Sequence, residues 1–210
     1  MKTDALIQAL AADHATPPPS LGRGMALALL VGGALTLALF LAVLGVRANA
    51  VTSLGSPRFV FKFVATGILA LTASALVLRL SRPGAPAPLW MLLVAPVLLA
   101  LGVAAELVSL PASAWLTSLF GTTWKMCLVF IPMLSLAPLA AILLALRRGA
   151  PTSPALAGMV AGLLAGGIGA FVYAAHCPGD SPLFLAAWYS LTIVAMALVG
   201  GAVGSRMLRW

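Results

Sequence analysis

Two apolar runs joined by a basic turn decide the fold of this chain. They read KMCLVFIPMLSLAPLAAILLAL (125–146), then RRGAPTS (147–153), then PALAGMVAGLLAGGIGAFVYAA (154–175). Each run has about 20 residues, and at about 1.5 Å per helical residue that length crosses the hydrocarbon core of a bilayer. A spanning segment must satisfy its own backbone hydrogen bonds, so both runs are predicted to be helices of an antiparallel hairpin.

The two cysteines of the chain lie at similar distances from this turn. Cys127 comes 20 residues before Arg147, and Cys177 comes 24 residues after Ser153. These separations correspond to roughly 30 Å and 36 Å along two antiparallel helices. Each distance is about one bilayer thickness. Both thiols are therefore predicted to lie at the membrane surface opposite the turn, where they can meet.

The composition of the whole chain is that of a membrane protein. Hydrophobic residues make up 62% and charged residues 8% of its 210 residues, and the mean hydropathy is +1.13. A soluble domain with so few charges could not cover its surface. The net charge of +8 does not indicate a nucleic-acid partner, because the basic residues stand singly or in pairs at the ends of apolar runs. Membrane lipid is the expected surrounding.

Six apolar segments predict an all-α membrane protein, a bundle of six transmembrane helices within residues 24–210. Each segment is long enough to span, and each is expected to be helical. The predicted helices cover residues 25–46, 59–80, 89–110, 125–146, 154–175 and 183–205. The chain is thus predicted to be a multi-pass membrane protein.

The lysines and arginines predict the orientation of this bundle. With the N-terminus inside, the cytoplasmic side holds Lys2, Arg23, Arg79, Arg82, Arg147, Arg148, Arg206 and Arg209, and the other side holds Arg47, Arg58, Lys62 and Lys125. An excess of basic residues marks the cytoplasmic side, so both termini are predicted to be cytoplasmic. Both cysteines then face the periplasm or the cell exterior, where a disulfide is chemically permitted.

Residues 1–23 form the longest polar stretch and are predicted to be a cytoplasmic tail with a short amphipathic helix. Thr3 or Asp4 can cap that helix, and its apolar side chains fall near one face at Leu6, Ile7 and Leu10. Two interpretations stay open at this point. The tail is either a solvated terminus or a docking helix for a cytoplasmic partner.

Small residues and rare charges mark two further features. Gly158, Gly162 and Gly166 recur every four residues and predict a smooth stripe for close helix packing. Glu106, Lys62 and Lys125 are predicted to lie at one membrane level, where Glu106 can pair with either lysine. This intramembrane group is either a proton or ion site, or an interfacial ion pair with snorkelling side chains.

Cys127, His176 and Cys177 have the side chains that soft metals prefer. Their spacing matches no closed structural zinc site, so no obligatory cofactor is expected. The three residues could capture a transient thiophilic metal ion, or the two thiols could oxidise. Alternatively, both cysteines are unrelated buried apolar residues. Catalysis is not expected, because the polar residues of 176–181 are too close in sequence to converge as a triad.

Several motifs together resemble one family. They are TD-x-LI-x-x-LA-x-D (3–13), PRF (57–59), W-x-x-C (124–127), RRGAP (147–151), AGLLAGG (161–167), HCP-x-DSP-x-F-x-x-x-WY (176–189) and LRW (208–210). This set, which covers nearly the whole chain, is similar to the NrsF-like family of six-helix bacterial inner-membrane anti-sigma factors. The cysteine-proline-x-aspartate-serine-proline stretch is its most specific part.

The resemblance implies a negative regulator that holds an extracytoplasmic-function sigma factor at the membrane. It implies that Cys127 and Cys177 sense heavy metal or oxidative stress, and that the segment with Asp4, Leu6, Ile7 and Leu10 contacts the sigma factor. Two alternatives remain at this stage. One is a small solute or ion transporter, or a membrane-enzyme subunit, that uses Glu106 and proline-kinked helices. The other is a purely structural membrane subunit.

Overall fold

The computed structural model describes residues 3, 7–8 and 21–209. The described residues contain helices and no strands, and six of the helical segments are long and apolar enough to cross a membrane. The predicted class, an all-α six-helix membrane protein, is confirmed. The spans are α2 (Leu21–Val43), α4 (Pro57–Leu80), η1 (Leu89–Leu93) with α5 (Val94–Ser109), α7 (Trp124–Leu146), α8 (Pro154–Tyr173), and α9 (Pro182–Phe184) with η3 (Leu185–Tyr189) and α10 (Ser190–Met207).

The first span differs most from its predicted range, since it runs from Leu21 to Val43 rather than over 25–46. Its early end has a local cause at Gly45. This glycine has a φ of 69°, and its N–H donates to the Phe40 carbonyl at 2.9 Å. A left-handed glycine just past a helix is a common stop, because side chains disfavour that conformation.

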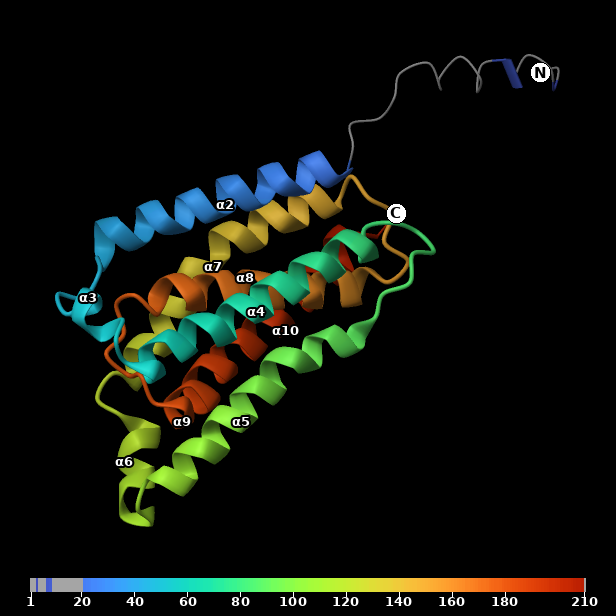
Figure 1. Cartoon of the computed structure of the whole chain (residues 1–210). Helices are drawn as coiled ribbons and strands as arrows, with labels where there is room; N and C mark the ends of the chain where they lie inside the picture. The colour runs from blue at the N-terminus through green and yellow to red at the C-terminus, as the bar shows by residue number, and fades with distance from the viewer. Residues whose placement is uncertain (1–2, 4–6, 9–20, 210) are drawn as a thin grey trace.

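The bundle is organised around α8, the most buried of the spans. Helices α10, α7 and α4 pack directly on α8, and α2 packs on α7 (Figure 1). Helix α5, the least buried span, lies at the outside of the bundle and contacts α4. Within residues 21–209, three short helices lie outside the spans: α3 (Ala50–Ser53), η2 (Ala112–Ala114) and α6 (Trp115–Phe120).

The glycine stripe of α8 faces α10. A Cβ atom at Gly158 would overlap the Gly200 carbonyl oxygen, and one at Gly162 would overlap the Met196 carbonyl oxygen. At Gly166 the added atom would lie 3.2 Å from the Cα of Ile193. The two helices therefore touch backbone to backbone. Such close approach is a main source of helix association in lipid, where the hydrophobic effect between helices is weak.

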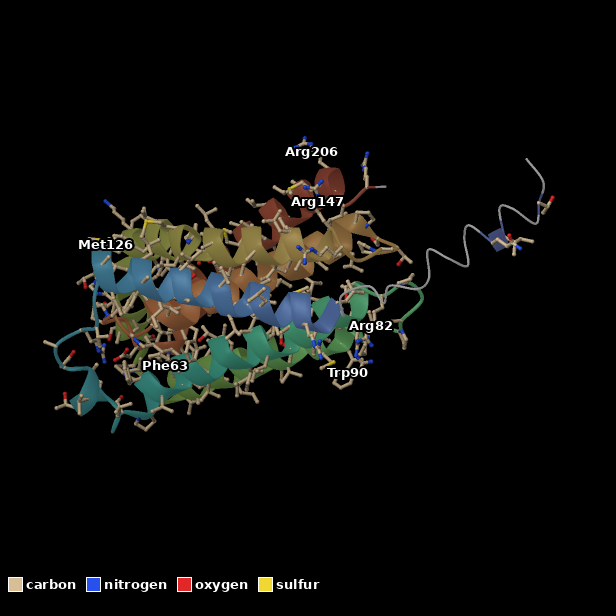
Figure 2. The ribbon with its side chains drawn as sticks, turned by 90° about the horizontal axis from the view of Figure 1, so that it is seen from above. Phe63, Arg82, Trp90, Met126, Arg147 and Arg206 are labelled. Carbon is tan, nitrogen blue, oxygen red and sulfur yellow. The ribbon has the colours of Figure 1, made fainter. Side chains whose placement is uncertain are left out.

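The two ends of the bundle differ in chemistry. Figure 2 shows Arg82, Arg147 and Arg206 at one end, which we call the arginine end, and Met126 and Phe63 at the other. We call the second end the thiol end, because it carries both cysteines. The start of α2 and the end of α10 lie together at the arginine end (Figure 1). Which end faces the cytoplasm stays a prediction of the lysine and arginine pattern.

Candidate functional site: a thiol pair and the loop that carries it

The site is built around the loop that joins α8 to α9. We call residues 174–181 the connecting loop. Its first turn continues from α8, because the Cys177 N–H donates to the Tyr173 carbonyl at 3.1 Å. Pro178 and Pro182 then prevent the chain from continuing as one helix. The Ser181 hydroxyl accepts the Phe184 N–H at 3.4 Å and caps the next helical segment.

The structure brings Cys127 and Cys177 together. Cys127 lies in the first turn of α7, Cys177 lies in the connecting loop, and the two side chains pack in one buried cluster. Both are free and fully buried. Thr123 Oγ1 lies 3.9 Å from Cys177 Sγ, and Tyr173 Oη lies 3.9 Å from Cys127 Sγ. Adjacent thiols of this kind can form a disulfide or bridge a thiophilic ion.

Two cations hold the connecting loop beside Cys177. The fully buried Lys62 ammonium donates to the Cys177 carbonyl at 2.7 Å and to Asp180 Oδ1 at 2.6 Å. The Arg47 guanidinium donates to both Asp180 oxygens, at 3.0 and 3.3 Å, and to the Cys177 carbonyl at 3.1 Å. The Phe59 ring lies 4.4 Å from the guanidinium carbon and 4.8 Å from the ammonium, close enough for cation–π attraction.

These surroundings act on the Cys177 thiol. A hydrogen bond from the Cys127 thiol lowers the pKa of Cys177, and burial opposes this effect. The positive charge of Lys62 lowers the same pKa further. Because the thiolate is the nucleophilic and metal-binding form of cysteine, these contacts favour a reactive sulfur at position 177.

Glu106 of α5 holds the far side of the connecting loop. Its Oε2 accepts the Ser181 hydroxyl at 2.7 Å and the Leu183 N–H at 3.0 Å. Its Oε1 lies 3.4 Å from Arg58 Nη2, and the carboxylate is almost fully buried. Glu106 thereby supplies an acceptor at the start of the last span, where helix N–H groups lack partners.

The predicted pairing of Glu106 with Lys62 or Lys125 is wrong. Lys62 is bound to Asp180, and Lys125 is exposed, with its ammonium 5.5 Å from the Trp124 ring. Counting residues along a helix predicts a depth in the membrane but not the direction in which a side chain points. Lys62 therefore meets the connecting loop, and Lys125 points outward instead of toward Glu106.

The predicted set of three metal ligands is not assembled. His176 Nδ1 lies 3.0 Å from the carbonyl oxygen of Gly45, so this imidazole is bonded to the segment that follows α2. Within residues 3, 7–8 and 21–209, no three His, Cys, Asp or Glu side chains are grouped to hold a metal ion. His176 and Cys177 are sequence neighbours whose side chains diverge in the turn. The thiol pair therefore offers two sulfur ligands.

Sequence reasoning missed the roles of Arg47, Asp180 and Ser181. The sequence offered one clue to these roles. Asp180 and Arg47 are predicted to lie at the same membrane surface and carry opposite charges, so an ion pair between them could have been expected. Tyr189 offered no such clue. It ends the π-helical segment η3 and packs in the same cluster as both thiols, and its buried hydroxyl has no partner among the described residues. Single π-helical turns occur frequently at functional sites.

The predicted sigma-contacting segment is described only in part. Ile7 is helical and exposed, as an apolar docking residue would be. Asp4, Leu6 and Leu10 lie outside the described residues.

Comparison with known proteins is consistent across the whole chain. A family profile described as "NrsF: Negative regulator of sigma F" matches residues 10–210. The chain is 41% identical over 214 residues to the anti-sigma-F factor NrsF of Caulobacter vibrioides, and 42% identical over 217 residues to the probable anti-sigma-F factor NrsF of Azospira oryzae. Both alignments cover 100% of either chain. No solved structure matches the chain. On these matches, the chain belongs to the NrsF family of negative regulators of sigma F.

Proposed function

We propose that this protein is an inner-membrane anti-sigma factor that releases its sigma factor when the Cys127–Cys177 pair reacts at the periplasmic face. The bound protein would be a sigma factor of the extracytoplasmic-function class. Family membership and the names of the two relatives support the anti-sigma role. The observation that carries the sensing role is the packing of two buried thiols, one from α7 and one from the connecting loop, in a single cluster.

The reaction at the thiols would couple two helices. A disulfide, or an ion bridging both sulfurs, ties the first turn of α7 to the connecting loop. Helices α7 and α8 are joined at their other ends by the turn 147–153, at the arginine end. A change in their relative position at the thiol end is thereby passed to the proposed cytoplasmic side. A stimulus that binds or reacts with one arrangement in preference to the other shifts the balance between them.

The stimulus would be an oxidant or a thiophilic metal ion such as Hg²⁺ or Cu⁺. Two thiolates satisfy the preference of these soft ions for sulfur. Such an ion would act as a transient signal rather than as a resident cofactor, because the described residues supply no third ligand beside the sulfurs.

The sigma factor would dock on the N-terminal segment that contains Ile7, in the manner of a helix in a groove. A pull-down from detergent-solubilised membranes tests this role. The full chain should capture a sigma factor, and a variant without residues 2–16 should not. Retention by both variants would move the contact to the loops of the arginine end, and retention by neither would contradict the anti-sigma proposal.

The sensing role has a separate test in the same assay. Treatment with the thiol oxidant diamide should lower sigma-factor recovery for the wild-type chain and leave it unchanged for Cys127→Ser with Cys177→Ser. Lys125→Met is the matched control, because Lys125 is exposed near Cys127 and touches neither thiol. Equal sensitivity of the wild type and the serine variant would contradict sensing by the pair.

The transporter alternative depends on Glu106. Its bonds to Ser181, Leu183 and Arg58 favour a structural role at the start of the last span. Loss of a solute-linked activity in Glu106→Gln, with sigma-factor retention intact, would instead favour transport.

A further inference from the structure

The two thiols differ in their electrostatic surroundings. Cys177 lies beside two cations, the buried Lys62 and the partly buried Arg47, both of which donate to its own carbonyl oxygen. We propose that Cys177 is the sulfur that reacts first with an oxidant, that Lys62 is its positioning residue, and that Cys127 completes the reaction. This inference rests on the proposed function only in that the pair is taken to be redox-active.

A count of charges supports this order. The group of Arg47, Lys62 and Asp180 contains two cations and one carboxylate, and Lys62 is fully buried. The other carboxylate within the described residues, Glu106, is paired with Arg58. One positive charge beside Cys177 is therefore not balanced by a carboxylate. An unbalanced buried charge is costly, so the group stabilises negative charge that develops on the adjacent sulfur.

Cys127 has no comparable partner. Its sulfur lies 3.9 Å from the neutral Tyr173 hydroxyl and packs among apolar side chains. The cation nearest to it in sequence, Lys125, is exposed and lies over the Trp124 ring. Negative charge on Cys127 would thus be buried without compensation. Cys127 is therefore assigned the second step, in which its sulfur attacks the already oxidised Cys177 sulfur and its proton passes to the departing hydroxyl.

The chemistry can be written with a hydroperoxide as the oxidant. Cys177 sulfur attacks the O–O bond, so that an S–O bond forms, the O–O bond breaks, and an alcohol or water leaves with the thiol proton. Cys177 becomes a sulfenic acid. The Cys127 thiol then attacks Cys177 sulfur, the S–S bond forms, and the S–O bond breaks. The sulfenic oxygen leaves as water with the Cys127 proton, and the hydroperoxide has accepted both electrons.

Single-cysteine variants of the full chain in detergent test the order of reaction. Each is treated with hydrogen peroxide and dimedone, which traps sulfenic acids, and the adduct is measured by mass spectrometry. Cys127→Ser, which retains Cys177, should accumulate adduct roughly tenfold faster than Cys177→Ser. Faster labelling of Cys127 in the second variant, or equal rates in both, would overturn the proposal. Neither variant changes Lys62, so this test does not depend on tolerance of a substitution there.

Charge substitutions in the Cys127→Ser background test the role of Lys62. Lys62→Met should slow labelling of Cys177 roughly tenfold, and Lys62→Arg should restore much of the rate. Asp180→Asn removes the balancing negative charge and should raise the rate. Damage to the loop would change the labelling rate in the same direction in Lys62→Met and Asp180→Asn. The charge effect lowers the rate in the first variant and raises it in the second. Lys125→Met should leave the rate unchanged. Equal rates in Lys62→Met and Lys125→Met would refute a positioning role.

These labelling experiments use the chain alone, without a sigma factor. A failure of the predicted order therefore leaves the anti-sigma proposal standing, and a failure to capture a sigma factor leaves the order of reaction standing.

Discussion

Helices α8 and α5 differ in how they are held in the bundle. Helix α8 touches α10 through glycine backbone along its length, with no room for a Cβ atom at Gly158 or Gly162. Helix α5 instead borders an apolar cavity of about 580 Å³, which separates part of it from α4 and α10. Glu106 fastens the thiol end of α5 to the connecting loop. One helix is fixed by continuous packing, and the other depends on a few polar contacts at its end.

This difference indicates which part of the bundle can change its structure when the thiols react. Side chains in a close-packed interface have one arrangement, and small changes there are resisted. Polar contacts at the end of a loosely packed helix can exchange with less disturbance. The connecting loop belongs to both regions, because it leaves α8 and is bonded to α5 through Ser181. A reaction at Cys177 would therefore act on a loop between a rigid pair of helices and a looser one.

The largest expected effect is in the rigid pair. Gly162→Leu places a side chain against the Met196 carbonyl and should destabilise the protein by about 3 kcal/mol or more, the upper range for overpacking. Thermal unfolding in detergent measures the loss. Gly33→Leu is the control, since a Cβ there meets no atom within 4 Å. Similar melting temperatures for the two variants would show that α8 and α10 are not in backbone contact.

An intermediate effect is expected at the attachment of α5. Glu106→Ala leaves the Ser181 hydroxyl and the Leu183 N–H without their acceptor, which should cost about 1–3 kcal/mol. Hydrogen exchange at the Leu183 amide should accelerate. Glu106→Gln retains a carbonyl acceptor, so its free energy of unfolding should fall less than that of Glu106→Ala. Unchanged exchange in Glu106→Ala would mean that this carboxylate does not hold the loop.

A smaller effect is expected where α6 meets the last span. The Trp188 indole N–H donates to the Leu119 carbonyl at 2.8 Å, and its ring stacks on Trp124 at 4.7 Å. Trp188→Phe keeps an aromatic ring and removes the hydrogen bond, so the free energy of unfolding should fall by about 1 kcal/mol. Faster proteolysis within 110–123 would report the release of α6. The exposed Trp90 provides the control as Trp90→Phe.

The smallest effect is expected in the cavity beside α5. Ala100→Leu adds the kind of bulk that is excluded at Gly162, at an exposed position on the edge of the cavity. Its free energy of unfolding should change by no more than about 0.5 kcal/mol. A loss as large as that of Gly162→Leu would show that α5 is seated as tightly as α8, and the contrast between the helices would disappear.

Hydropathy was sufficient to predict the six spanning helices, because each segment in lipid must satisfy its own backbone hydrogen bonds whatever its neighbours are. Spacing was also sufficient for the glycine stripe and for the common level of Cys127 and Cys177. It failed for Glu106, because depth along a helix does not specify the face on which a partner lies. The contacts of Asp180 and Ser181 could not be predicted either, since they depend on the path of a loop without a periodic pattern.

The complete burial of both thiols has a consequence for timing. If the pair senses oxidants as proposed, a water-borne oxidant would reach Cys177 only while the thiol end is transiently open. At low oxidant concentration the chain recloses before reacting, so the reaction rate rises in proportion to concentration. At high concentration the rate levels off at the frequency of opening. Few molecules would then react during a brief pulse of oxidant, and most would react during a sustained exposure. The rate of that response would be limited by how often the thiol end opens.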